Sequence, residues 1–174
     1  MQSLSRKTGF TPTEIFRKYL WYLLQERSFD TEAVDDMVHL RAVLGLKDEQ
    51  VADAIAERSR RILAKMGPIL FATAGMTAEG IARKAAERSF FAKLLFLSEC
   101  DALIDQSSLA KERLSVPDCF NVTNPADVER MRIVSLHNLD LSKLELLATA
   151  GPEDDAGNPD EAAAPAEESV EMDE

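Results

Sequence analysis

Seven cations in two short segments form the most conspicuous candidate binding surface in this sequence. They are Arg58, Arg60, Arg61, Lys65, Arg83, Lys84 and Arg88. If residues 58–65 are helical, Arg58, Arg61 and Lys65 lie on one face, because their spacing is three and four residues. Such a face, extended by the second segment at residues 83–88, has the charge to bind an acidic protein, nucleic-acid phosphate or anionic lipid headgroups.

The alternative is that these cations form only a solvated face that is paired with local carboxylates. Glu57, Glu79 and Glu87 lie close enough in the sequence for such pairs. Nucleic-acid binding is disfavoured by the distribution of charge, because residues 151–174 hold ten of the 31 acidic residues and no basic one. The remaining chain therefore has 21 acidic against 20 basic residues and lacks the net positive charge that is typical of a nucleic-acid-binding domain.

Aromatic residues are crowded in the segment 16–22, where they are more numerous than one buried stripe needs. They are Phe16, Tyr19, Trp21 and Tyr22. Trp21 and Tyr22 either face outward as a contact patch, as such residues often do at interfaces, or are buried by a neighbouring helix. The candidate contacts with a partner are therefore Trp21, Tyr22, Arg58, Arg61 and Lys65.

No constellation of residues predicts catalysis, a metal site or a cofactor site. The chain lacks the HExxH, CxxC, GxGxxG and GxxxxGK[ST] patterns, and we expect its two histidines, His39 and His137, to be structural. Cys100 and Cys119 are too few and too far apart for a disulfide framework, so free thiols in a reducing compartment are expected. We predict a non-enzymatic protein without a cofactor.

Helix start and stop signals predict four long helices in the first part of the chain. Thr11 is placed to cap a helix that begins at Pro12, because a proline suits the first helical position and Glu14 completes a capping box. Gly45 and Gly67 are placed to end the second and third helices. The expected helices cover about residues 12–26, 31–44, 48–65 and 78–97, with apolar residues at intervals of three and four.

Shorter helices are expected in the remaining sequence. They cover about residues 98–105, 108–114, 125–136 and 139–149. Ser98 opens the first with a capping box, Pro117 ends the stretch that contains the second, and Asn124 opens the third, which is expected to bury Val134. No segment alternates apolar and polar residues between turns, so the predicted fold class is all-α.

One phrase of the sequence is similar to a known family. Residues 35–65 read DDMVHLRAVLGLKDEQVADAIAERSRRILAK, in which a leucine-rich helix ends in LRxxLGL and the next helix follows the pattern VxxAIxExxxxI. Over about residues 30–100 the chain resembles the helical units of the stromal scaffold in the chloroplast inner-envelope translocon, and plastid armadillo-like helical-repeat proteins. Lys47 departs from the pattern, because a capping Ser, Thr or Asp is expected there.

This resemblance implies an armadillo-like stack of about six to eight helices that holds other proteins in a plastid, and it transfers no catalytic residue. We expect a flexible N-terminus at residues 1–10, an all-helical domain at residues 11–150 and a disordered acidic tail at residues 151–174. No apolar run is long enough to span a membrane, and residues 1–9 lack the apolar stretch of a secretory signal.

The leading prediction is a scaffold or adaptor that binds another protein, located in the chloroplast or alternatively in the cytoplasm. The second is anion binding, including peripheral contact with lipid headgroups, through the basic face of residues 58–65 and 83–88.

Overall fold

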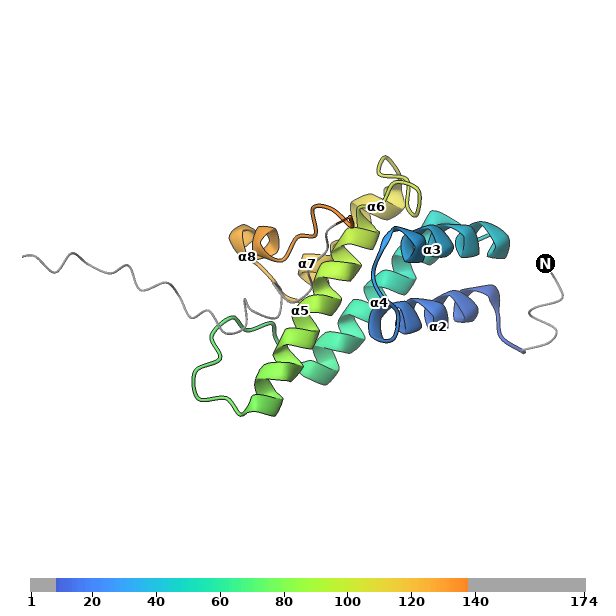
Figure 1. Ribbon diagram of the computed structural model, residues 1–174. Helices are drawn as coiled ribbons and strands as arrows, with labels where there is room; N and C mark the ends of the chain where they lie inside the picture. Colours follow the sequence, from blue (N-terminus) through green and yellow to red (C-terminus); the bar gives the residue numbers. More distant parts are fainter. Residues whose placement is uncertain (1–8, 138–174) are drawn as a thin grey trace, which may run out of the picture.

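A computed structural model describes residues 9–137, and within this range every regular element is an α-helix (Figure 1). The helices are α2 (Pro12–Gln25), α3 (Thr31–Leu44), α4 (Asp48–Met66), α5 (Ala78–Ser98), α6 (Leu109–Arg113), α7 (Val116–Cys119) and α8 (Pro125–Arg130). The predicted helix at 139–149, the acidic tail at 151–174 and most of the predicted flexible N-terminus lie outside the described residues.

The four long helices begin and end where the local signals predict. The backbone N–H of Glu14 donates to the Thr11 hydroxyl at 3.3 Å, while the Thr11 N–H donates to the Glu14 carboxylate at 2.7 Å, which completes the capping box of α2. Asp30 accepts a hydrogen bond from the Ala33 N–H at the start of α3. These side chains satisfy backbone donors that the first turn of a helix leaves without a partner.

Helix α4 is the centre of the packing, and Figure 1 shows it running beside α5 with α2 and α3 at one end. It contacts α2, α5, α6 and α7, while α3 packs on α2 and α7 also packs on α5. The buried core contains residues from all of these helices, among them Phe16, Leu20, Met37, Ile55, Phe91, Leu94 and Phe120. These six helices, α2 to α7, form an arrangement that is consistent with an armadillo-like helical domain.

Three predictions for the second half of the chain are wrong. Ser98 does not open a new helix, because its hydroxyl donates to the Leu95 carbonyl at 2.7 Å and the residue belongs to the last turn of α5. Pro117 does not end a helical stretch but lies in the first turn of α7, where its missing N–H costs nothing. Val134 is 90% exposed, because α8 already ends at Arg130.

Two glycines in helical segments should respond differently to replacement by alanine. Gly45 follows α3 as its C-cap and has a left-handed backbone conformation, with φ of 65°. A Cβ is strained in this conformation, so Gly45→Ala should lower the free energy of unfolding by about 1–2 kcal/mol. Gly80 is the matched control: it lies in the first turn of α5, where an added Cβ would be 3.4 Å from the Thr77 hydroxyl oxygen. Gly80→Ala should leave stability unchanged or raise it by up to about 1 kcal/mol. Urea unfolding of both variants tests this pair, and equal effects would contradict it.

Candidate functional site

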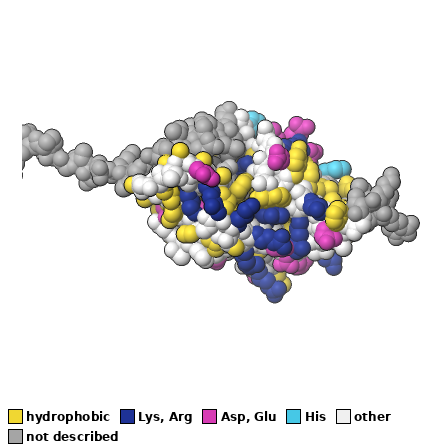
Figure 2. All heavy atoms as spheres, turned by 90° about the horizontal axis from the view of Figure 1, so that it is seen from below, with side chains coloured by type: hydrophobic (Ala, Val, Ile, Leu, Met, Phe, Trp, Pro, Cys, Tyr) yellow, Lys and Arg dark blue, Asp and Glu magenta, His cyan; other side chains and the backbone are white. Residues whose placement is uncertain are grey.

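An open groove of about 720 Å³ lies where α2, α4 and α5 meet. Its apolar side chains are Trp21, Ile62, Met66, Ala86 and Phe90, its charged side chains are Arg58, Arg61, Lys65 and Arg83, and Gln25 completes the lining. Figure 2 shows Lys and Arg side chains gathered, with hydrophobic side chains beside them, on the face seen from below. All the charged residues that line the groove are cations, so it is suited to a negatively charged occupant.

Trp21 lies in the groove between a cation of α4 and an aromatic ring of α5. The centroid of its ring is 5.6 Å from that of Phe90, and the guanidinium carbon of Arg58 is 4.4 Å from the centroid of the Trp21 ring. This distance is within the range of a cation–π interaction. Trp21 is half-buried, so the structure places it between the two orientations that the sequence left open.

The groove brings together all but one of the residues that were predicted to contact a partner. Trp21, Arg58, Arg61 and Lys65 line it, from two helices that lie far apart in the sequence. Tyr22 does not line it: this side chain is 48% exposed, and its ring is 5.9 Å from that of Tyr19 on the same helix. The helical spacing of Arg58, Arg61 and Lys65 therefore correctly predicted that they share one face of α4. Tyr22 follows Trp21 directly but lies outside the groove, so its contact with a partner stays a prediction.

The groove cations are only partly neutralised by carboxylates. Arg61 pairs with Glu57 at 2.5 Å, and Glu57 also binds Arg17 at 2.7 Å. Within residues 9–137, neither Arg58 nor Lys65 forms an ion pair. Burial of the guanidinium, followed by the nearby charge of Arg61, lowers the pKa of Arg58 from its usual value. Arg58 is therefore a partly desolvated cation that forms no ion pair in the described part of the chain, although the charge of nearby Glu57 partly opposes the lowering of its pKa.

The second cationic segment is not the exposed face that the sequence predicted. Lys84 is 8% exposed and Arg88 is fully buried. The ammonium of Lys84 donates to the carbonyls of Met66 and Pro68, both at 2.7 Å, and pairs with the Glu87 carboxylate at 2.9 Å. Lys84 thus binds backbone carbonyls at the end of α4 and at the start of the segment 67–77 that connects α4 to α5. Of the predicted second segment, Arg83 reaches the groove.

Arg88 completes this internal anchor. Its guanidinium donates to the Leu70 carbonyl and lies 5.0 Å from the centroid of the Phe71 ring. The guanidinium of Arg130 from α8 is 4.8 Å from the same ring. The Phe71 ring is thus held by two cations, which ties the segment 67–77 to α5 and α8.

Comparison with known proteins shows the family of the fold. Residues 8–99 match the model of the Armadillo-like helical domain-containing protein 5 family. The chain belongs to this family. The matched range contains α2 to α5, and thus every helix that lines the groove, while α6 to α8 lie beyond it. The armadillo-like part of the predicted resemblance is confirmed, whereas no match links the chain to a plastid or a translocon. No curated protein and no solved structure shows a significant match.

The groove of this armadillo-like domain continues along α2 into a second hollow of about 410 Å³. The two hollows share Trp21, Arg58 and Arg61, and the second adds the cations Arg17 and Lys18 together with Ala54 and the carboxylates of Glu14 and Glu57. The sequence prediction did not include these two cations. Their spacing of four and three residues from Trp21 places them on its side of a helix, and this signal was sufficient to find them.

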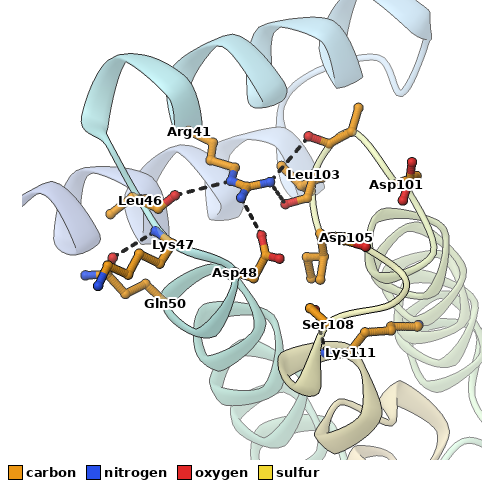
Figure 3. Close-up of polar contacts among 12 residues, drawn as sticks. Arg41, Leu46, Lys47, Asp48, Gln50, Asp101, Leu103, Asp105, Ser108 and Lys111 are labelled. Carbon is orange, nitrogen blue, oxygen red and sulfur yellow. Dashed lines mark hydrogen bonds and ion pairs between the residues drawn. The ribbon is translucent and has the colours of Figure 1, made fainter.

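A second dense set of polar contacts in the armadillo-like domain is structural (Figure 3). Arg41, near the end of α3, donates to the carbonyls of Leu46 at 3.3 Å and Leu103 at 2.6 Å and pairs with Asp48. It therefore joins the end of α3, the start of α4 and the segment after α5. The N–H of Lys47 donates to the side-chain carbonyl of Gln50 at 3.0 Å, so the helix begins at Asp48 as predicted although Lys47 carries no capping oxygen.

Other reactive side chains of the described domain lie outside the groove. His39 and His137 are exposed, and Cys100 and Cys119 are free thiols. Among residues 9–137, no group of three His, Cys, Asp or Glu side chains is arranged to hold a metal ion. Within the same range, none of the helices has the length and apolar character to cross a membrane.

Proposed function

We propose that this chain is a non-enzymatic helical adaptor that binds another protein at the groove between α2, α4 and α5. The observation that carries the proposal is the Trp21 ring, which is half-buried in an open groove beneath the guanidinium of Arg58. Tryptophan and arginine are enriched among the residues that dominate binding energy at protein interfaces. Membership of an armadillo-like family supports protein binding in general, because stacked helices create extended concave surfaces.

The burial of Lys84 and Arg88 weakens the alternative of a broad anion-binding face. These two cations bind backbone carbonyls of the chain itself, so they are not accessible to phosphate or lipid headgroups. The remaining cations surround an apolar groove, which fits a protein side chain better than a flat membrane surface.

Replacement of Trp21 by leucine tests this function. Trp21→Leu preserves apolar contact with Phe90 but removes the aromatic face on which Arg58 stacks, so it should weaken partner binding at least about tenfold. Tyr22→Ala is the matched control on the same helix, because Tyr22 lies outside the groove. The measurement is recovery of one identified partner by the wild-type chain and each variant, with circular dichroism to verify folding. Equal recovery by Trp21→Leu would reject the groove as the interface.

The proposal also includes a cellular location, which is a plastid, with the cytoplasm as the alternative. The resemblance stated from residues 35–65 supports a plastid, and the free thiols suit either a plastid stroma or the cytoplasm. Proximity labelling with the chain in its native cell would report the compartment and the neighbouring proteins together. Labelling confined to cytoplasmic proteins would reject the plastid.

A further inference from the structure

The floor of the groove offers a surface for one large apolar side chain. Trp21 and Phe90 are both half-buried and in contact, at 5.6 Å between ring centroids, and Ile62 and Met66 lie beside them on α4. An apolar side chain that covers these rings removes apolar surface of both partners from water. Aromatic floors of this kind are where anchor residues of a protein partner bind.

The cations around the apolar floor form the rim of the groove, and they favour negative charge next to the apolar side chain of the partner. Arg58, Arg61, Lys65 and Arg83 surround the floor, and none of the residues that line this groove is acidic. Arg58 forms no ion pair within the described residues, and part of its hydration is already lost through burial. A carboxylate from a partner would therefore form a charge-assisted hydrogen bond with Arg58, whose neighbouring carboxylate Glu57 is already paired with Arg17 and Arg61.

The occupant of the groove is more consistent with an acidic protein segment than with nucleic acid. Without residues 151–174 the chain has 21 acidic and 20 basic residues, so it lacks the long-range positive field that brings nucleic acid to a surface. The cations are instead concentrated around one groove of about 720 Å³. Local charge around an apolar floor matches a short peptide with an apolar side chain between acidic residues.

We infer that the groove binds an acidic segment of a partner protein, with one large apolar side chain of that segment against Trp21 and Phe90 and its carboxylates against Arg58, Arg61 and Lys65. This inference rests on the proposed function and specifies the chemistry of the partner. The adjoining hollow extends the site along α2 and adds Lys18, whereas its Arg17 is already paired with Glu57 and Glu14 also lines it.

The test uses the full chain and the fluorescence of Trp21, which is the only tryptophan in the sequence and therefore reports on the groove directly. The probe is a nine-residue synthetic peptide with one leucine between glutamates and aspartates. It should change the Trp21 emission in a saturable manner, with an affinity that falls as salt increases. A peptide with lysines in place of the acids, and one with glycine in place of leucine, should each bind at least about tenfold more weakly.

The variants compare cations of one helix. Arg58→Gln combined with Arg61→Gln should weaken binding of the acidic peptide about tenfold or more, because it removes two of the four cations that line the groove. Arg60→Gln is the matched control: Arg60 is exposed on α4 but does not line the groove, so the affinity should stay within about twofold. Equal losses in both variants would overturn the assignment.

Other outcomes are equally decisive. If the peptide binds only after Glu167, Glu168, Glu171, Asp173 and Glu174 are replaced by their amides, the inferred chemistry holds and the chain's own acidic residues compete for the groove. If it binds in neither form, or if an RNA oligonucleotide of equal charge binds more tightly, the inference is wrong. If the acidic peptide fails in this way but a partner protein is still lost in Trp21→Leu, the proposed function holds and only the acidic chemistry of the partner is rejected.

Discussion

Replacing Lys84 with methionine should lower the free energy of unfolding by about 3–5 kcal/mol at neutral pH. Glu87 is fully buried, and one of its carboxylate oxygens pairs with the Lys84 ammonium at 2.9 Å, while the other has no hydrogen-bond partner among residues 9–137. Methionine preserves the apolar stem of the side chain but leaves the Glu87 carboxylate without its cation. It also removes the donor to the carbonyls of Met66 and Pro68.

The pH dependence of this loss has a definite sign. Burial raises the pKa of Glu87 above its ordinary value of 4.5, and the hydrogen bond from Lys84 opposes that rise. Without Lys84 the pKa of Glu87 in the folded state rises further, so the folded protein binds a proton at a higher pH than the unfolded chain. The loss caused by Lys84→Met should therefore be largest at neutral pH and should shrink as the pH falls toward about 4.5.

Urea unfolding of Lys84→Met across this pH range provides the measurement. The double variant Lys84→Met with Glu87→Gln is the control, because it removes the buried carboxylate and should recover much of the stability at neutral pH. A loss that does not change with pH, or that the second substitution does not reduce, would show that the ion pair is not its cause.

Replacing Phe120 with alanine should lower the free energy of unfolding by about 3–5 kcal/mol. Phe120 is 1% exposed, and its ring meets that of Phe91 on α5 edge to face, with 5.3 Å between the centroids. It lies beyond residues 8–99, which match the family model, so the substitution tests whether the later helices belong to the same cooperative unit. Because α7 packs on both α4 and α5, we expect one unfolding transition for all of them.

Trp21 fluorescence during urea unfolding measures this effect from a distant helix. In Phe120→Ala the Trp21 transition should move to lower urea as a single step. Val134→Ala is the matched control, since this side chain is 90% exposed, and it should change stability by less than about 0.5 kcal/mol. An unchanged Trp21 transition in Phe120→Ala would mean that the helices after residue 99 unfold separately.

The long helices could be predicted from the sequence because their ends are set by local chemistry. Thr11 with Glu14, Asp30 and Gly45 satisfy or terminate the backbone of the helix beside them, whatever packs against it. Ser98 carries a similar local signal, yet its hydroxyl bonds to the carbonyl of Leu95 within α5. A capping residue marks a helix start only when the preceding helix has already ended, and that condition depends on the packing of the whole domain.

In the candidate site, too, features set by local spacing could be predicted, whereas features set by packing between helices could not. The spacing of Arg58, Arg61 and Lys65 places them on one face of α4, so their proximity could be predicted. The position of Trp21 beneath Arg58 depends on the approach of α2 to α4, which no spacing within one helix determines. Lys84 and Arg88 were expected on the surface because cations are seldom buried, but here backbone carbonyls of the segment 67–77 provide their partners.

The segment 67–77 is anchored to α5 through its backbone carbonyls. Lys84 and Arg88 bind the carbonyls of Met66, Pro68 and Leu70, which are backbone groups that occur at intervals of two residues. Since any amino acid supplies a carbonyl, substitutions at positions 68 and 70 leave these acceptors in place. Inserting or deleting one residue between 66 and 70 moves an acceptor out of register with its cation. Natural relatives should therefore differ freely in side chains here while they conserve the length of the segment.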